Sequence, residues 1–151
     1  MIHVPSPLRL RLDSDALVAN WRWLAAQSGA AACGAAVKAN GYGLGAREVV
    51  RHLSAAGCRD FFVATWAEAA ALMPLPEAIS VSVLHGVGAS DMVAAHMLPA
   101  RPVLNSLAQV ARWNEAGEGR PCDVMIDTGM NRLGLSPGEA MGGALDGLNI
   151  E

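Results

Sequence analysis

One lysine, Lys38, ends a run of small apolar residues and is followed at once by a glycine-rich turn, in the segment AAVKANGYGLGA. A lysine attacks a carbonyl carbon only when its amine is uncharged, and apolar neighbours such as Val37 and Ala39 favour that form. The glycines do not match the GxGxxG loop of dinucleotide-binding proteins. Lys38 is therefore a candidate nucleophile, although a solvated or ion-paired lysine fits the same position.

A second candidate lies in the segment VMIDTGMNRLGL, where an apolar run leads into a tight polar turn. Arg132 follows this turn, and its planar guanidinium is suited to orienting a carboxylate or a phenolate. The alternative is an ion pair between Asp127 and Arg132 that only holds the loop. The residues alone leave both interpretations open.

Six short apolar runs alternate with longer amphipathic stretches and would carry these side chains. The runs are AACGAAVK, FFVAT, AISVSVL, RPVLN, CDVMID and LNIE. Continuous apolar strands separated by helices are typical of a parallel sheet buried on both faces, in a (β/α) barrel or a doubly wound sheet. In a barrel, catalytic side chains lie at the carboxyl ends of the strands, so Lys38 and Arg132 are expected at one rim.

Capping residues predict where the helices begin. Asp13 or Ser14 precedes a helix that ends before Gly29. Thr65 with Glu68, and Ser136 with Glu139, have the spacing of capping boxes, and Pro137 occupies the favoured first helical position. The strict alternation of residues 8–12 differs from the other runs and predicts a half-exposed strand outside the barrel.

Composition narrows the possible partners and the location. The chain is 52% hydrophobic and 17% charged with a net charge of −3, which predicts a globular domain with no basic surface for nucleic acid or membrane. The N-terminus lacks the pattern of a signal peptide, and no apolar run reaches membrane-spanning length. The three cysteines and four histidines show no metal-ligand spacing, so we expect no metal and a cytoplasmic, reducing location.

Three motifs resemble those of one enzyme family. KANGYGLG resembles the pyridoxal-phosphate lysine motif of alanine racemases, usually written AVVKANAYGHG, and DTGMNRLGL resembles their second signature. The opening RLRLDSDALVANWRWL resembles the IDLDALxxN start of the family. Because the three motifs occur in the family's order over nearly the whole chain, the sequence is similar to the N-terminal part of an alanine racemase.

The resemblance implies an enzyme that uses pyridoxal 5'-phosphate to interconvert L-alanine and D-alanine, supplying D-alanine for peptidoglycan. By motif position, Lys38 corresponds to the lysine that forms the Schiff base and moves a proton on one face of the substrate. Tyr42 corresponds to the tyrosine at the cofactor phosphate, and Arg132 to the arginine near the cofactor phenolate and the substrate carboxylate. The family is expected to be homodimeric, with a partner tyrosine as the second base.

Two departures from the family pattern affect this expectation. Met125 stands where many members have a carbamylated lysine, and Gly41 and Leu44 alter the AYGHG turn. Tyr42 is the only tyrosine, so no second base is present and the chain alone should be inactive. Alternatives are a non-catalytic pyridoxal-phosphate-binding protein, another barrel-type enzyme of this cofactor such as an amino-acid decarboxylase, or a cofactor-free binding barrel.

The expected organisation is a strand at 1–12 outside the barrel, belonging in the family to the second, β domain, and a partial barrel at 13–151. A complete eight-unit barrel needs roughly 250 residues, and this chain offers about five units and the start of a sixth. We interpret it as the N-terminal portion of a (β/α)8 barrel, ending before the remaining strands and the C-terminal β domain. Such a portion is expected to associate with itself or with the segments that complete it.

Overall fold

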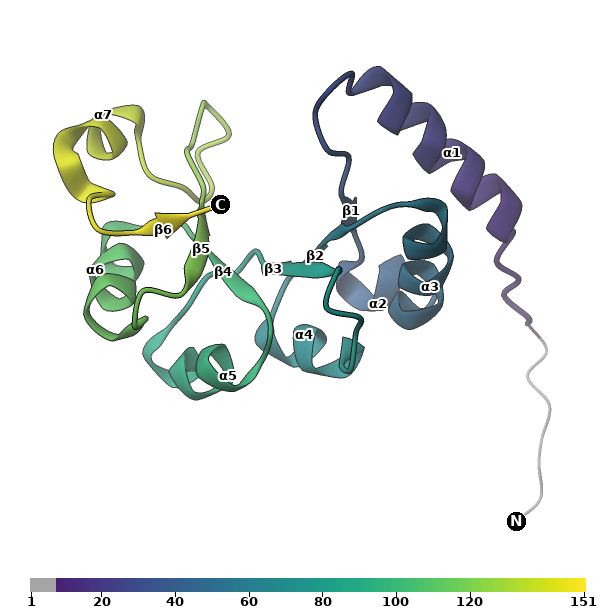
Figure 1. Ribbon diagram of the computed structural model, residues 1–151, viewed down its shortest axis with the longest axis horizontal. Coiled ribbons are helices and arrows are strands. Elements are labelled where there is room, and N and C mark those ends of the chain that lie inside the picture. Colours follow the sequence, from purple (N-terminus) through teal and green to yellow (C-terminus); the bar gives the residue numbers. More distant parts are fainter. Residues whose placement is uncertain (1–7) are drawn as a thin grey trace, which may run out of the picture.

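The computed structural model describes residues 8–151, which form one α/β unit around a six-stranded sheet (Figure 1). The strands are parallel and lie in chain order. They are β1 (Ala35–Ala36), β2 (Asp60–Val63), β3 (Ser80–Val83), β4 (Arg101–Leu104), β5 (Pro121–Val124) and β6 (Asn149–Ile150). Each predicted apolar run overlaps one of them, with β2 and β5 beginning one residue before their runs, so the six predicted strands are confirmed.

Helices connect the strands and lie along the convex side of the curved sheet, as in a (β/α) barrel (Figure 1). They are α1 (Ser14–Gln27), α2 (Lys38–Tyr42), α3 (Ala46–Ala56), α4 (Trp66–Leu72), η1 (Ala89–Asp91), α5 (Met92–Met97), α6 (Leu107–Ala116), α7 (Pro137–Glu139) and η2 (Ala140–Ala144). The sheet does not close, because β1 and β6 each have only one neighbouring strand among residues 8–151. The expected partial barrel is therefore confirmed.

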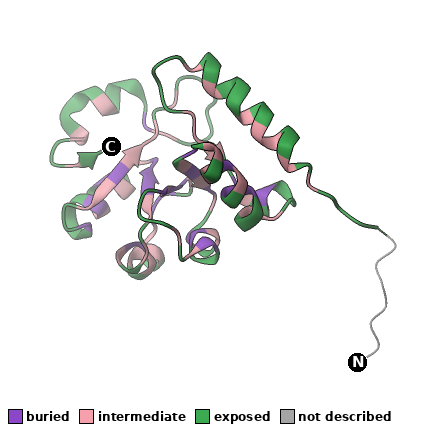
Figure 2. Ribbon diagram, turned by 45° about the vertical axis from the view of Figure 1, so that its right-hand side comes forward, coloured by how far each residue is buried: buried purple, intermediate pink, exposed green. Residues whose placement is uncertain are grey.

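The core lies between the sheet and these helices, where buried residues gather on the strands and the helix faces turned toward them (Figure 2). Phe61 and Val63 of β2 and Val83 of β3 are fully buried. Burying a side chain of this size contributes about 1.5–3 kcal/mol. This layer fixes the position of the strand ends that carry the candidate site.

The predicted helix starts are confirmed at all three places, and at two of them the capping contacts also form as predicted. Asp13 caps α1 by accepting a hydrogen bond from the Ala16 amide at 2.9 Å. Ser136 and Glu139 form the predicted capping box, with Pro137 in the first turn of α7. These contacts depend only on residues close in sequence, which explains why the spacing predicts them.

The other predicted capping box, at Thr65, is only half formed. The Thr65 hydroxyl accepts a hydrogen bond from the Glu68 amide at 3.3 Å, as predicted. The Glu68 carboxylate, however, does not return to Thr65. It accepts hydrogen bonds from the amides of Ala64 and Ala39, because the end of β1 lies beside the start of α4.

The strand predicted at residues 8–12 does not form within the described part of the chain. Residues 8–13 belong to no helix or strand, and Leu8 and Leu10 are 84% and 71% exposed. A strand requires a partner for its backbone hydrogen bonds, and no strand among residues 8–151 pairs with this segment. Residues 1–7 lie outside the described residues, and the division at residue 12 stays a prediction.

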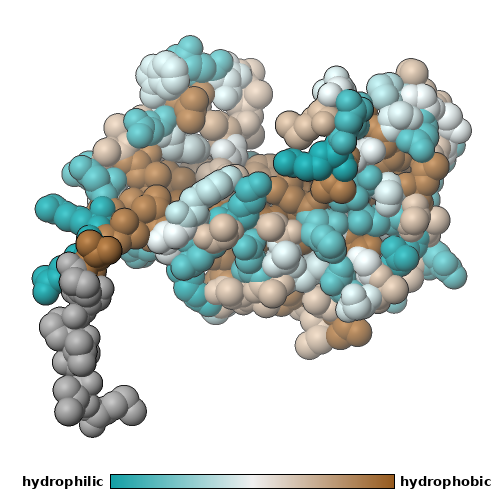
Figure 3. Space-filling view, turned by 180° about the vertical axis from the view of Figure 1, so that it is seen from behind, coloured by the Kyte–Doolittle hydropathy of each residue, from teal (hydrophilic) through white to brown (hydrophobic). Residues whose placement is uncertain are grey.

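The open barrel leaves a hollow in the molecular surface. Seen from behind, the surface is indented between two lobes, and apolar side chains line the base of the indentation (Figure 3). Among residues 8–151, no helix combines the length and the apolar character needed to cross a membrane. The predicted association of this open sheet with other chains stays a prediction.

Candidate active site

Lys38 lies at the carboxyl end of the first barrel strand, as predicted. The strand hydrogen bonding continues to Val37, whose amide donates to the Phe62 carbonyl at 2.8 Å. Val37 is 1% exposed and packs into the core, whereas Lys38 is partly exposed. Since successive side chains of a strand point to opposite faces, burial of Val37 on the helix side directs Lys38 to the inside of the barrel.

The chain after Lys38 forms one left-handed turn, labelled α2 in Figure 1. Ala39, Asn40, Gly41 and Tyr42 have φ angles of 51°, 52°, 65° and 54°. Residues with a Cβ adopt this region at a cost, and strained backbone of this kind clusters at functional sites. Glycine spacing in the sequence predicts a turn here, but not that Ala39, Asn40 and Tyr42 would share the left-handed conformation.

Hydrogen bonds from both sides hold this turn. The Gly41 amide donates to the Val37 carbonyl at 2.8 Å, and the Asn40 side-chain oxygen accepts from the Ala46 amide at 3.0 Å. Gly41 is buried against the start of α3, where an added Cβ would lie 3.1 Å from the Ala46 nitrogen. The turn is therefore closely packed against α3.

Arg132 lies in the loop that follows β5, as predicted. The loop returns to the sheet through a bridge between Ile126 and Leu135, and Leu135 is 1% exposed. The guanidinium of Arg132 makes no hydrogen bond or ion pair with any residue in the described range 8–151. The proposed alternative, an ion pair with Asp127, is not formed.

The Asp127 carboxylate instead holds the backbone of its own loop. It accepts hydrogen bonds from the amides of Gly129 at 2.9 Å and Asn131 at 2.9 and 3.1 Å. These bonds, the one from Gly129 foremost, stabilise the charged carboxylate and lower the pKa of Asp127. Asp127 thus shapes the loop while the Arg132 side chain stays available to a ligand.

Lys38 and Arg132 line one cavity of about 320 Å³ at the carboxyl ends of the strands. Its other lining residues come from the ends of β2, β3 and β5 and from the following loops, namely Ala64, Thr65, Leu84, His85, Met125 and Leu133. Lys38 makes no ion pair with a described residue, so the salt-bridged alternative is not formed within residues 8–151. The cavity therefore offers one amine and one guanidinium to the same ligand.

His85 is a residue of this cavity that the sequence reasoning missed. Its imidazole is 3.8 Å from the Asp91 carboxylate and largely exposed. His85 directly follows the third apolar run, AISVSVL. Because the carboxyl ends of parallel strands share one rim, this position could have predicted that His85 lies near Lys38. Met125 lines the cavity as well, so the methionine that departs from the family pattern lies beside the site.

Tyr42 is the predicted site residue that the structure does not bring to this cavity. It is 64% exposed at the end of the left-handed turn and is not among the lining residues. Its backbone is left-handed, with a φ of 54°, which no sequence pattern indicated. Its contact with a cofactor phosphate stays a prediction.

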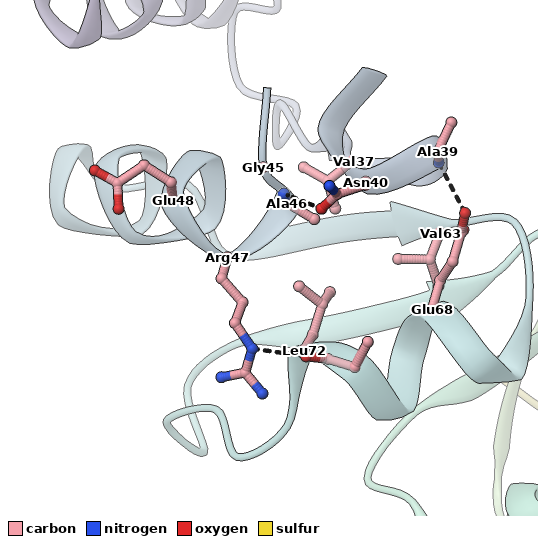
Figure 4. A pocket seen from close by; sticks show the side chains of 11 residues that line it. Val37, Ala39, Asn40, Gly45, Ala46, Arg47, Glu48, Val63, Glu68 and Leu72 are labelled. Atoms are coloured by element: carbon pink, nitrogen blue, oxygen red, sulfur yellow. Dashed lines mark hydrogen bonds between the residues drawn. The ribbon is translucent and has the colours of Figure 1, made fainter. Parts of the chain in front are cut away.

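A larger cavity of about 760 Å³ lies on the other side of the same strand ends (Figure 4). It is bordered by Val37 and Val63, by the start of α3 and by Glu68 and Leu72 of α4. Arg47 closes it by donating to the Ala71 carbonyl at 2.7 Å. Neither Lys38 nor Arg132 borders this cavity, so its size does not identify it as the candidate active site.

A parallel βα sheet that curves and does not close, with a lysine and an arginine on one rim, has the architecture of the N-terminal portion of a (β/α) barrel. The chain belongs to the family described as "Alanine racemase, N-terminal domain", whose model matches residues 12–149. The resemblance inferred from the three motifs is thereby confirmed.

Individual relatives agree with this assignment. The alanine racemases of Methylobacterium nodulans and Acidiphilium cryptum are 43% and 46% identical over 137 and 134 residues, covering 88% and 87% of this chain. The chain spans 37% of the length of each of these two relatives.

Solved structures show the same fold. An alanine racemase from Bartonella henselae with covalently bound pyridoxal phosphate is similar with a TM-score of 0.81 and 34% identity, over 91% of this chain and 41% of that one. The biosynthetic alanine racemase from Pseudomonas aeruginosa has a TM-score of 0.69 and 32% identity, over 84% of this chain and 36% of that one. The predicted barrel fold is confirmed.

Proposed function

We propose that this chain is the lysine-bearing portion of a pyridoxal-phosphate-dependent alanine racemase that interconverts L-alanine and D-alanine. The observation that carries the proposal is the shared cavity, where Lys38 and Arg132 both lack a charged partner among residues 8–151. Family membership and the bound cofactor named for the Bartonella henselae relative support the same reaction. The product would supply D-alanine for peptidoglycan, in a cytoplasmic homodimer.

The residues present fit this cofactor. Pyridoxal phosphate is an anionic aldehyde, and the cavity offers it an amine and a guanidinium, neither of which has an ion-pair partner within the described residues 8–151. When bound, the cofactor supplies a conjugated ring that takes up the electron pair left by the α-proton of an amino acid. Lys38 would hold the cofactor covalently, and Arg132 would orient its phenolate oxygen or the substrate carboxylate.

The chain's own residues provide one of the two bases that racemisation needs. The Lys38 amine, once free, would accept or donate a proton at the substrate α-carbon on one face. Tyr42, the only tyrosine, is 64% exposed outside the cavity, and by its motif it would contact the cofactor phosphate. The base for the opposite face would therefore come from outside this chain.

Met125 changes how Arg132 is positioned. A thioether carries no charge, so Met125 offers Arg132 no anion of the kind that a carbamylated lysine would provide. Arg132 is instead placed by its loop, which Asp127 holds through backbone amides. The guanidinium would accordingly meet the cofactor or the substrate without a competing anion at position 125.

Reductive labelling tests the proposal directly. The chain is incubated with pyridoxal phosphate and reduced with borohydride, and the labelled peptide is mapped by mass spectrometry. We expect the label on Lys38, and a Lys38→Arg variant should lose it while keeping the positive charge. A label confined to the N-terminal amine would contradict the assignment.

A comparison of activities tests the role of the missing base. Loss of a positioned general base costs about 10²–10⁴-fold in rate. We expect a longer protein carrying this sequence together with the remaining length of its relatives to racemise alanine, and the 151-residue chain to be slower by at least this factor. Equal rates from the two proteins would contradict the proposal.

A further inference from the structure

The Glu68 carboxylate joins the two strand ends that border the candidate active site. One carboxylate oxygen accepts a hydrogen bond from the Ala39 amide at 2.8 Å, and the other accepts one from the Ala64 amide at 2.7 Å. Ala39 directly follows Lys38, and Ala64 lines the cavity that contains Lys38. Figure 4 shows Glu68 reaching from α4 toward the Ala39 nitrogen.

The bond to Ala39 constrains the backbone of Lys38. A peptide unit is planar, so fixing the Ala39 N–H fixes the plane of the bond that joins Lys38 to Ala39. This plane sets the ψ angle of Lys38 and therefore the direction from which its side chain starts. A carboxylate at this point thus acts on the lysine through the backbone, without contacting the amine.

The turn that follows Lys38 needs such support. Ala39, Asn40 and Tyr42 all have positive φ angles, a region that residues with a Cβ avoid. Strained backbone persists only where surrounding contacts determine it. Ala39 is exposed and contributes little packing of its own, so hydrogen bonds hold it. Its carbonyl accepts from the Gly43 amide within the turn at 3.0 Å, and its amide donates to Glu68, the contact that ties it to α4.

Glu68 does not border the Lys38 cavity, but lines the larger cavity on the other side of the strand ends. Its side chain is partly buried and its two oxygens are occupied by backbone amides. Glu68 is therefore not placed to act as an acid or base toward a substrate in the Lys38 cavity. Its contacts are those of a residue that positions another.

We propose that Glu68 is a positioning residue for Lys38, clamping the ends of β1 and β2 so that the lysine amine is directed into the cavity. The proposal rests on the proposed function, because it assigns a purpose to the direction of Lys38. The hydrogen bond between Glu68 and the Ala39 amide does not depend on any cofactor, so it can be tested separately.

The chain offers a matched control for a test of this clamp. Glu139 occupies the same position in the first turn of α7, and its carboxylate accepts from the Ser136 amide at 2.7 Å. Glu68→Gln and Glu139→Gln therefore make the same chemical change, in which an amide –NH₂ replaces one accepting oxygen. Only the first change lies next to Lys38.

Amide hydrogen exchange gives the first readout and needs no cofactor. Loss of a charge-assisted hydrogen bond is expected to speed exchange by about tenfold. In Glu68→Gln this should affect Ala39 and Ala64, and in Glu139→Gln only Ser136. Unchanged exchange at Ala39 in a folded Glu68→Gln protein would overturn the proposal.

The rate of covalent attachment of pyridoxal phosphate to Lys38, trapped by borohydride, gives the second readout. We expect about a tenfold fall in Glu68→Gln, in line with the loss of one charge-assisted hydrogen bond, and no change in Glu139→Gln. Equal falls in both variants would show a general loss of stability and overturn the positioning role. If the unsubstituted chain takes no label on Lys38, the proposed function fails, and the exchange measurement still decides the role of Glu68.

A rescue variant covers the possibility that Glu68→Gln folds poorly. Glycine adopts positive φ without steric cost, so Ala39→Gly should reduce the need for the clamp. We expect Glu68→Gln combined with Ala39→Gly to recover most of the labelling rate and the folded structure. No recovery in the double variant would contradict an action of Glu68 through the turn.

Discussion

Lys38 and Arg132 come from strands far apart in the sheet and line the same cavity, Lys38 at the end of the edge strand β1 and Arg132 in the loop after β5. Neither side chain has an ion-pair partner among residues 8–151. Two basic side chains that face one cavity favour an anionic ligand between them. The geometry of this pair is the basis of the first prediction.

Removal of the Arg132 charge should weaken binding of pyridoxal phosphate. A charge-assisted hydrogen bond contributes about 1.5–3 kcal/mol, so Arg132→Ala should raise the dissociation constant by roughly 10- to 100-fold. Equilibrium titration of the chain followed by absorbance measures this change. Arg22→Ala, a charge removal on an exposed position of α1, should leave the constant unchanged. If the two substitutions raised the dissociation constant equally, the effect would come from the net charge of the chain, and the prediction of a direct contact with Arg132 would be wrong.

Gly41→Ala should destabilise the protein more than Gly29→Ala. Both glycines have positive φ, at 65° and 61°, so both substitutions introduce the same backbone strain of about 1–2 kcal/mol. Only at Gly41 does the new Cβ meet the Ala46 nitrogen, at 3.1 Å, whereas Gly29 has open space. Urea unfolding should show the larger loss at Gly41. Equal losses would mean that α3 moves away at no cost.

The loop that carries Arg132 should loosen in acid. Backbone hydrogen bonds lower the pKa of Asp127 below its ordinary 3.8. A group whose pKa is lower in the folded state stabilises the fold fully above its unfolded pKa, and this contribution is lost as pH falls through the folded pKa. We therefore expect the amide NMR signals of Gly129 and Asn131 to shift below pH 3.8. In Asp127→Asn this pH dependence should disappear.

Two of the three cysteines should resist alkylation. Burial disfavours the thiolate and raises the pKa of Cys58 and of Cys122 from 9.0 to about 11. Since the thiolate is the reacting form, a shift of this size slows the reaction by about 100-fold at neutral pH. Mass spectrometry after brief iodoacetamide treatment should find the label on Cys33, which is partly exposed. Early labelling of Cys58 or Cys122 would indicate local opening of the core.

The chain should associate at micromolar concentration. Within residues 8–151, β1 and β6 each have one edge that pairs with no strand, and large apolar side chains such as Trp23 and Met97 are 65% and 77% exposed. Open edges and exposed apolar surface favour pairing with other chains. Light scattering over a dilution series should show a mass that rises with concentration. A stable monomer at every concentration would contradict the prediction.

Sequence alone determined the features that depend on local patterns. Apolar runs predicted all six strands, because burial on both faces requires continuous apolar residues. The caps at Asp13 and Ser136 followed from side chains only three residues from the amides they bind. The shared rim of Lys38 and Arg132 followed from their places at the ends of parallel strands.

Tertiary structure decided the contacts between residues far apart in the chain. Glu68 has the spacing of a capping box, yet its carboxylate binds the Ala39 amide, because packing brings β1 beside α4. Tyr42 lies in the matching motif, but it is exposed and does not line the Lys38 cavity. The spacing allowed an ion pair between Asp127 and Arg132. In the folded turn, however, the Asp127 carboxylate accepts hydrogen bonds from the amides of Gly129 and Asn131 instead. Residue spacing limits which partners are possible, and only the packed backbone decides which partner lies within hydrogen-bonding distance.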